Sequence, residues 1–193
     1  ITDEGISILG DEVAAEMKII KELRLWMSST QVGDAGLKSL FTNLRGTMAT
    51  VKVLQMCLYH TLITDESIKI FAEECLSKVE SLQLLELWAA ETKISDFSMV
   101  PFLSSMNKSS ANMSKLVLSL QGTRITDQTY IAFNHEVLSN LQNLKELQLL
   151  FGQTQVSDSS LAPCFKTLTS KVQGVRSFEL GMNDVITETA VHV

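Results

Sequence analysis

The chain has 193 residues, with 22 acidic and 16 basic side chains and a formal net charge of −6 at pH 7. No stripe of Lys and Arg recurs along it, as a surface that tracks phosphates would require, so we expect no nucleic-acid partner. Hydrophobic residues make up 45% of the chain, yet no stretch approaches the roughly 18 consecutive apolar residues of a membrane span. We therefore expect no membrane partner.

The regular spacing of one residue type organises the sequence. Aspartates recur at intervals of 31 residues, at Asp3, Asp34, Asp65, Asp96, Asp127 and Asp158. A fixed period of this size is typical of a solenoid, in which every interval builds the same unit and stacks on its neighbours. We therefore predict a single repeat array over residues 1–193, with about six repeats.

Both ends of the sequence depart from this pattern. Residue 1 lies inside a repeat, and residues 185–188 imitate the aspartate motif one residue early. Solenoids are normally closed at each end by a repeat with a polar outer face. Neither end has that character, so we expect the chain to be a fragment of a longer protein, without its caps.

Read in chain order, each unit predicts a helix, a strand and a loop. Apolar residues follow each aspartate by three, six and ten positions, as in Leu37, Leu40 and Leu44, and this spacing marks one face of a helix. The strand then carries apolar residues in the pattern LxxLxL, at Ile20-Leu23-Leu25, Val51-Leu54-Met56, Leu82-Leu85-Leu87, Met113-Leu116-Leu118, Leu144-Leu147-Leu149 and Val175-Phe178-Leu180. A Thr-x-Ile/Val-x-Asp loop leads into the next helix.

The pattern LxxLxL, followed by Val32, Asp34, Gly36, Leu37 and Leu40, resembles the leucine-rich repeat of the ribonuclease-inhibitor-like class. The resemblance covers essentially the whole chain. The repeats are longer than is usual in that class, and threonine stands where the family prefers asparagine, a variant that resembles the long repeats of ciliate and other protist proteins. The resemblance implies an α/β solenoid, a right-handed horseshoe with a parallel sheet on its concave face and helices on its convex face.

We interpret the recurring polar residues as structural. An aspartate that precedes an amphipathic stretch can accept hydrogen bonds from the first N–H groups of its own helix and meets the positive end of the helix dipole. The residues just before it are candidate caps, namely Thr64, Ser95, Thr126 and Ser157. A row of metal sites is disfavoured, because no second ligand accompanies each carboxylate.

A column of threonines recurs with the same period, at Thr30, Thr61, Thr92, Thr123 and Thr154. We expect these residues to form a buried ladder of hydroxyl groups that satisfies loop backbone groups between neighbouring coils.

No pattern of catalytic chemistry is present in the sequence. The three histidines fall at unrelated repeat positions, and no phosphate-binding loop or nucleophile motif occurs. Cys57, Cys75 and Cys164 have neither a disulfide framework nor zinc-binding spacing, and the last two occupy positions that are apolar in other repeats. We predict no enzymatic activity, no cofactor and no metal, and we expect a reducing, cytoplasmic compartment.

The outward strand positions form three columns on the predicted concave face. The first column is Glu22, Val53, Leu84, Lys115, Glu146 and Ser177. The middle column is Arg24, Gln55, Glu86, Val117, Gln148 and Glu179. The third column is Trp26, Cys57, Trp88, Ser119, Leu150 and Gly181.

Both tryptophans of the chain lie in the third column. Tryptophan within a concave apolar patch is typical of a binding hot spot, although isolated exposed apolar residues need no functional explanation. The candidate partner-binding residues of this face are Trp26, Trp88, Arg24, Val53, Gln55, Leu84, Glu86, Val117, Gln148 and Leu150.

We predict an interaction module or scaffold that uses its concave face to bind another protein. Two alternatives remain open. An activator of a small GTPase, similar to the Ran activators, is disfavoured because Arg24 is the only arginine in the columns. A structural subunit of a cytoskeletal or ciliary assembly would use the convex helices as well.

Overall fold

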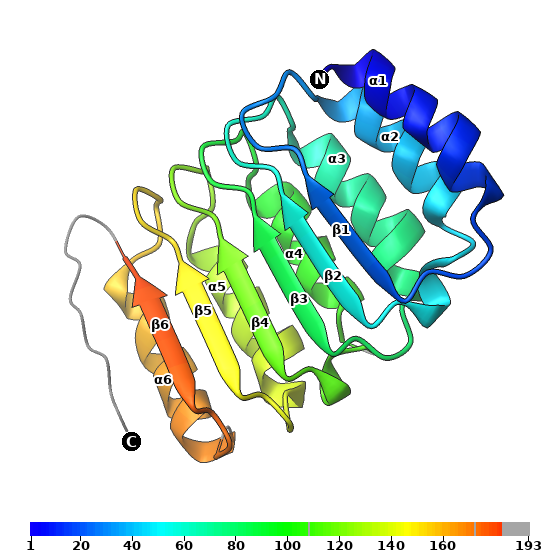
Figure 1. The fold of residues 1–193 in the computed structure, drawn as a ribbon. Coiled ribbons are helices and arrows are strands. Elements are labelled where there is room, and N and C mark those ends of the chain that lie inside the picture. The colour runs from blue at the N-terminus through cyan, green and yellow to red at the C-terminus, as the bar shows by residue number, and fades with distance from the viewer. Residues whose placement is uncertain (108, 172, 183–193) are drawn as a thin grey trace.

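The computed structural model describes residues 1–107, 109–171 and 173–182. Six strands form one parallel sheet in the order β1-β2-β3-β4-β5-β6. Their bounds are β1 (Glu22–Trp26), β2 (Val53–Cys57), β3 (Leu84–Trp88), β4 (Lys115–Ser119), β5 (Glu146–Leu150) and β6 (Ser177–Gly181). Figure 1 shows these strands side by side, with a layer of helices behind them. The α/β solenoid predicted from the sequence is confirmed, while the motif at residues 185–188 lies outside the described residues.

The strands pair in a register that never shifts. Glu22 of β1 lies beside Val53 of β2, and Val53 lies beside Leu84 of β3. The same offset of one repeat continues to β6. Each repeat position therefore stacks on its own equivalents, about 4.8 Å apart, and the three predicted columns are real rows of side chains.

Each of the six described α-helices of the outer layer begins at an aspartate. The helices are α1 (Asp3–Ile8), α2 (Asp34–Leu44), α3 (Asp65–Ile70), α4 (Asp96–Ser105), α5 (Asp127–Ala132) and α6 (Asp158–Lys171). The hydroxyls of Thr64, Ser95 and Thr126 accept a hydrogen bond from the backbone N–H two residues further on, so these three residues are the predicted N-caps. The Ser157 hydroxyl contacts Ser159 Oγ and Asp127 instead. No described helix is long and apolar enough to cross a membrane.

The helical layer alternates between two kinds of repeat. In the first, third and fifth repeats the α-helix continues into a π-helical turn and a 3₁₀ turn, namely η1 (Leu9–Val13) and η2 (Ala14–Glu16), η4 (Phe71–Cys75) and η5 (Leu76–Lys78), and η7 (Phe133–Val137) and η8 (Leu138–Asn140). In the second and fourth repeats the α-helix, α2 or α4, ends without a π-helical turn. A separate 3₁₀ turn follows after a short gap, namely η3 (Met48–Thr50) or η6 (Ser110–Asn112).

The two kinds of repeat also differ in the side-chain hydrogen bonds at the helix end. The Thr47 hydroxyl donates to the Leu44 carbonyl at 2.8 Å, and the Ser109 hydroxyl donates to the Met106 carbonyl at 3.2 Å. Each of these carbonyls also accepts a backbone N–H from the turn that follows the helix, so the hydroxyl adds a second bond at the helix end. Over the first five repeats, the helical layer therefore has a period of two repeats.

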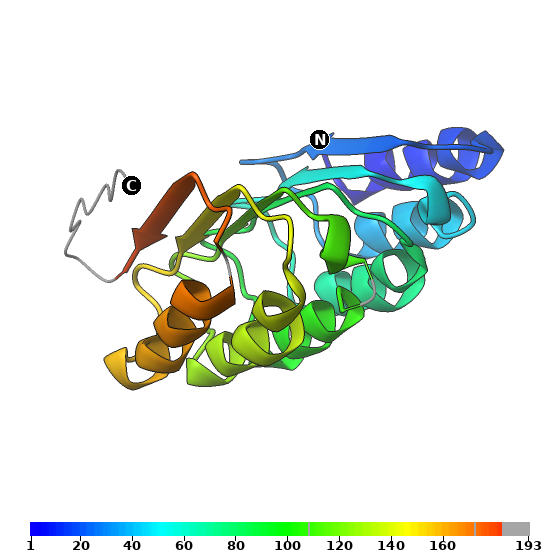
Figure 2. The ribbon, with the colours of Figure 1, turned by 90° about the horizontal axis from the view of Figure 1, so that it is seen from below.

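The core fills the space between the sheet and the helices. Inward strand residues such as Leu85 and Leu116 are fully buried. Phe41 packs against Phe71 with ring centroids 4.8 Å apart. Cys75 and Cys164 are buried as predicted, and burial is the main reason why the pKa of the Cys75 thiol rises to about 12. Figure 2 shows the two layers from below, with the sheet on the inner side of the arc and the helices on its outer side.

The aspartate column joins successive repeats. The Asp96 carboxylate accepts hydrogen bonds from the Thr126 N–H (2.9 Å) and hydroxyl (2.7 Å), and from the Thr129 N–H (3.1 Å) and hydroxyl (2.6 Å). Asp34 makes the equivalent bonds to the third repeat. The prediction that each aspartate caps its own helix is wrong, because the stacking of coils brings the next helix's first turn within reach of the carboxylate.

These bonds change the acidity of the aspartates. For Asp34 and Asp96 burial alone would raise the pKa, but the hydrogen bonds donated by the next repeat outweigh burial and lower it. For Asp127 the bonds from Ser157 are the largest cause, and they also lower the pKa.

The threonine column works within a single coil. Each hydroxyl donates to the backbone carbonyl three residues earlier, as Thr61 does to Leu58 at 2.6 Å and Thr123 does to Leu120 at 2.6 Å. Thr30, Thr92 and Thr154 repeat this bond. The predicted bonding to backbone groups is confirmed, but its placement between neighbouring coils is wrong. The turn after each strand folds the threonine back onto its own chain.

The aspartate ladder can be tested with Asp96→Asn. The new amide NH₂ group would face donors of the fifth repeat, so we expect the free energy of unfolding to fall by about 1–3 kcal/mol. Urea unfolding followed by circular dichroism measures this change. Glu66→Gln, at an exposed position on α3, is the control and should change stability by less than about 0.5 kcal/mol. Equal effects of the two substitutions would contradict a structural role for Asp96.

The lowered pKa values predict a loss of stability in acid. A carboxyl whose folded-state pKa is depressed stabilises the fold above its unfolded pKa, and this contribution is lost as the pH falls through the folded value. We expect the free energy of unfolding to decline as the pH drops below the ordinary aspartate pKa of 3.8. The variant Asp34→Asn/Asp96→Asn/Asp127→Asn should be less stable at neutral pH. Its free energy of unfolding, measured by urea unfolding at successive pH values, should fall less steeply as the pH drops. An unchanged slope in this variant would refute the assignment.

Candidate functional site

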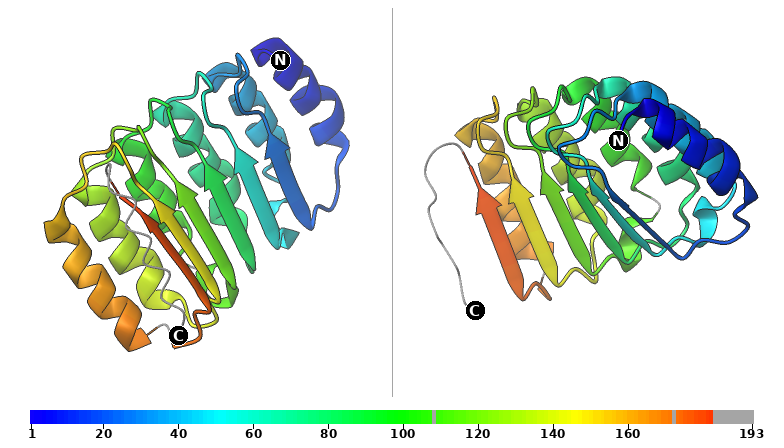
Figure 3. Two further views of the ribbon diagram at one scale, coloured as in Figure 1. Left: turned by 60° about the vertical axis from the view of Figure 1, so that its left-hand side comes forward. Right: turned by 45° about the horizontal axis from the view of Figure 1, so that its top comes forward.

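The face of the sheet that points away from the helices carries the candidate site. Figure 3 shows the sheet in two further, oblique views, with the helices on one side of it. Trp26 at the end of β1 is 64% exposed, and Trp88 at the end of β3 is partly exposed. The structure therefore places both tryptophans on the concave face, with β2 between the strands that carry them.

The third column alternates between large and small residues. Trp26, Trp88 and Leu150 come from the first, third and fifth repeats, and Cys57, Ser119 and Gly181 come from the repeats between them. A Cβ atom on Gly181 would lie 2.8 Å from Leu150 Cδ2, so the leucine side chain occupies the space beside the glycine. A small residue next to each large one gives the large side chain room across the neighbouring strand. Comparing alternate repeats of the sequence would have revealed this pattern, whereas the single-repeat alignment did not.

A chain of polar contacts forms the floor of the face. Arg24 Nε donates to Gln55 Oε1 at 2.6 Å, and Gln55 Nε2 donates to Glu86 Oε2 at 2.8 Å. Lys115 Nζ then lies 2.9 Å from Glu86 Oε1 and 3.4 Å from Glu146 Oε2. These contacts connect β1 to β5, so most of the floor is fixed before any partner arrives.

Glu86 is the buried centre of this chain of contacts. It is only 7% exposed. Burial would raise the pKa of its carboxyl, but hydrogen bonds from Lys115 and Gln55, the charge of Lys115 and a bond from the Trp88 side chain together lower it. Glu86 therefore remains ionised at neutral pH and links the polar floor to the tryptophan column.

Two predicted contact residues are not available at the surface. Val117 is 1% exposed, although it lies outside the core between the layers, so its neighbours on the sheet cover it. Glu86 is similarly covered. Their burial argues against direct contact with a partner. The sequence pattern gives the side of the sheet that a side chain faces, but not how far its neighbours extend over it.

The remaining predicted residues fall into two groups. Val53, Leu84 and Leu150 are partly exposed apolar residues. Leu150 lies in the tryptophan column at the strand ends, whereas Val53 and Leu84 begin β2 and β3. Arg24, Gln55 and Gln148 are already engaged in bonds across the sheet, and Gln148 Nε2 donates to Glu179 Oε2 at 2.7 Å. The face therefore offers its aromatic contact area at the strand ends, a smaller apolar area at the starts of β2 and β3, and ordered polar side chains between them.

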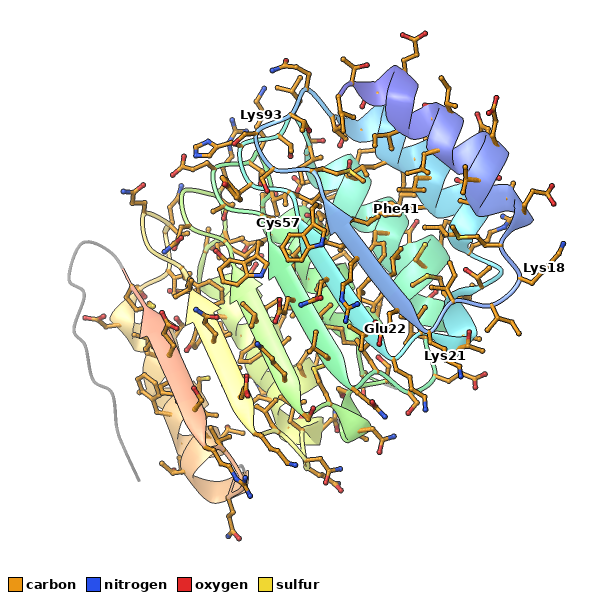
Figure 4. The ribbon with its side chains drawn as sticks, viewed as in Figure 1. Lys18, Lys21, Glu22, Phe41, Cys57 and Lys93 are labelled. Carbon is orange, nitrogen blue, oxygen red and sulfur yellow. The ribbon has the colours of Figure 1, made fainter. Side chains whose placement is uncertain are left out.

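Metal-binding clusters and cysteines are the remaining chemical features to consider on this face. In the described part of the chain, no group of three or more His, Cys, Asp or Glu side chains is arranged to hold a metal ion. Cys57 is the partly exposed cysteine of the face, and its Sγ lies 3.0 Å from Ser28 Oγ. Figure 4 shows Cys57 on the open side of the sheet, between the ends of the strands. Its thiol is a useful site for chemical labelling.

Comparison with known proteins supports the fold. No protein-family model matches the chain, and no curated protein sequence matches it. Among solved structures, leiomodin-1 actin-binding site 2 (ABS2) superimposes with a TM-score of 0.52 and 15% sequence identity, over 92% of this chain and 78% of that chain. At this identity the likeness establishes a leucine-rich-repeat type of α/β solenoid.

The role of Lys115 in the polar floor can be tested with Lys115→Met. Without this cation, burial dominates at Glu86, so its pKa should rise and the protein should lose about 1–3 kcal/mol of stability at pH 7. NMR titration of the Glu86 carboxyl carbon measures the first effect, and urea unfolding measures the second. Adding Glu86→Gln to this variant should recover part of the loss, because no buried charge then remains. An unchanged Glu86 titration would contradict the proposed coupling.

Proposed function

We propose that this chain is a protein-interaction module that holds another protein on its concave face. The observation that carries the proposal is the 64% exposure of Trp26, in one column with the partly exposed Trp88 and Leu150. An exposed indole leaves a large apolar area in contact with water. Burial of this area against a partner would be favourable. Tryptophans at such positions are frequent binding hot spots.

The polar floor supports this proposal by its rigidity. The contacts from Arg24 through Gln55 and Glu86 to Lys115 fix side chains that would otherwise have to be ordered on binding. Immobilising such a side chain costs about 0.5–1.5 kcal/mol in an association. A face that is ordered in advance avoids much of this cost and therefore favours affinity.

The comparison supports the class of partner. The solved structure that resembles this chain is named as an actin-binding site, and we propose a protein partner for this chain as well. We further propose that residues 1–193 form one array of the ribonuclease-inhibitor-like class with protist-type long repeats, that it acts as a binding scaffold in the cytoplasm, and that it is not an enzyme. The three free cysteines support that compartment.

A role as an activator of a small GTPase receives less support from the face. Such activators commonly stabilise the transition state with a free arginine. The Arg24 guanidinium lies 2.5 Å from Glu22 Oε2 and donates to Gln55, so it is held against the sheet. A GTP hydrolysis assay with candidate small GTPases tests this alternative directly.

The proposal predicts that the tryptophans dominate the affinity. Trp26→Ala/Trp88→Ala should weaken binding of an isolated protein partner at least thirtyfold, since a hot-spot truncation costs about 2 kcal/mol or more, while the circular dichroism spectrum stays unchanged. Isothermal titration calorimetry measures the affinity. Phe97→Ala is the matched control, because Phe97 is a 68% exposed aromatic residue on α4 in the helix layer.

A labelling experiment supplies an independent readout. Cys57 lies between Trp26 and Trp88 in the column, so a bound partner should slow its reaction with a maleimide. Cys75 and Cys164 are buried in the native protein and contribute little reaction. Full affinity of the two-tryptophan variant, or an unprotected Cys57 in the complex, would overturn the concave-face proposal.

A further inference from the structure

The strand-start edge of the sheet carries a row of cations that follows the repeat period, so the expectation that no Lys and Arg stripe recurs along the chain is wrong at this edge. The residue just before each strand is Lys21, Lys52, Gln83, Ser114, Lys145 or Arg176. All four charged members are exposed. Among the described residues, none of the four forms an ion pair, whereas Lys115 on the floor has two. The row is therefore free to attract an acidic group.

The opposite edge has a different charge. There the six aspartates begin the helices, and Lys93, Arg124 and Glu91 are the charged residues of the neighbouring loops. Figure 4 shows Lys93 at that edge and Lys18 and Lys21 at the strand-start edge, at opposite ends of the sheet. The protein as a whole has a net charge of −6. Its strand-start edge is thus a local positive region on an acidic molecule.

A hollow strengthens this region at its C-terminal end. It has a volume of about 520 Å³, and its lining includes Lys145 and Arg176 together with the polar side chains of Gln142, Asn143 and Gln173. A carboxylate in this hollow would meet two cations that have no partner among the described residues. The edge therefore offers positive charge both as a row and as a recess.

The cation row and the tryptophan column are separated by a distance that suits a helix. Their backbone positions are five residues apart along the chain, or about 16 Å at 3.3 Å per residue. The cations precede the strands, so they lie at the rim of the sheet, outside the three columns of the floor. An α-helix with its side chains is about 10–12 Å wide, and an extended lysine covers the remaining distance. Trp26 and Trp88 are two strand spacings apart, about 9.6 Å, which is close to the roughly 10.5 Å between helix positions i and i+7.

We propose that the partner binds through an acidic amphipathic α-helix that lies across the strands. Its apolar flank packs on Trp26, Trp88 and Leu150, and its acidic flank faces Lys21, Lys52, Lys145 and Arg176. This inference rests on the proposed function of the concave face and adds the shape and charge of the partner's binding element. Charge complementarity of this kind fixes orientation and accelerates association.

A nucleic acid fits this surface less well than an acidic helix. The floor next to the cations carries exposed Glu22, Glu146 and Glu179, and these carboxylates would repel phosphates that cross the sheet. A helix can place its acidic residues on one flank only and keep uncharged residues over the floor. We therefore assign the row to a protein segment.

The proposal can be tested with a displayed library of helical 18-residue peptides. Each member has a fixed apolar stripe of Leu and Trp. All the remaining positions vary among Glu, Lys, Gln and Ser. Selection on the whole chain should enrich acidic members, with glutamates on one flank. Fluorescence anisotropy with the enriched peptides then measures affinity. Lys21→Glu/Lys52→Glu and Lys145→Glu/Arg176→Glu should each weaken binding about tenfold or more and reduce its dependence on salt.

A matched variant controls for the change in net charge. Lys93→Glu/Arg124→Glu reverses two exposed cations at the opposite edge, and it should leave the affinity within about twofold, since exposed charges that do not contact the ligand are largely screened. Enrichment of neutral or basic peptides, or no enrichment at all, would overturn the inference. So would binding of duplex DNA that is lost in the strand-start variants, since the row would then be a general polyanion site.

The same peptides separate this inference from the proposed function. If charge reversal weakens binding but Trp26→Ala/Trp88→Ala does not, the cation row acts without the tryptophan column and the proposed concave anchor fails. If the tryptophan variant loses binding while charge reversal has no effect, the concave-face function stands and the acidic helix is wrong. The inference holds only when both sets of variants weaken the same peptide.

Discussion

The constant register between parallel strands is the constraint on which the rest of this structure depends. Each residue of β1 pairs with its equivalent one repeat later, and this offset is maintained through β6. The aspartates secure the register at the loop edge, because each described link, such as Asp96 to Thr126 and Thr129, spans two coils. A shift of one residue would break these bonds and turn every core side chain of a strand outward.

The same register creates the candidate site. Stacked equivalent positions turn single residues into columns, so the tryptophans of the first and third repeats and the leucine of the fifth form a spaced row on the concave face. The alternation of helix types in the outer layer has the same two-repeat period as the alternation of large and small residues in this row. The sheet face and the helix layer therefore share one larger unit, although each is built from different residues.

The sequence predicted the solenoid well because its signals are local and repeated. The LxxLxL spacing and the aspartate period are enough to place every strand and helix start. Other features depend on contacts between coils, which a single repeat cannot reveal. The aspartates bond to the following helix, Val117 is covered by neighbouring side chains, and the cations of the strand-start edge stand out only when pairing is known. Which side chains cover one another, and which groups form hydrogen bonds or ion pairs, depends on the three-dimensional stacking of the coils.

The central claim is that a protein partner occupies the concave face. Hydrogen–deuterium exchange of the chain, alone and with its partner, tests this claim most directly. The account predicts slower exchange in the turns that follow β1, β2 and β3, next to Trp26, Cys57 and Trp88, with little change in α2 to α5. Protection confined to those helices, with unchanged exchange beside the tryptophans, would contradict it.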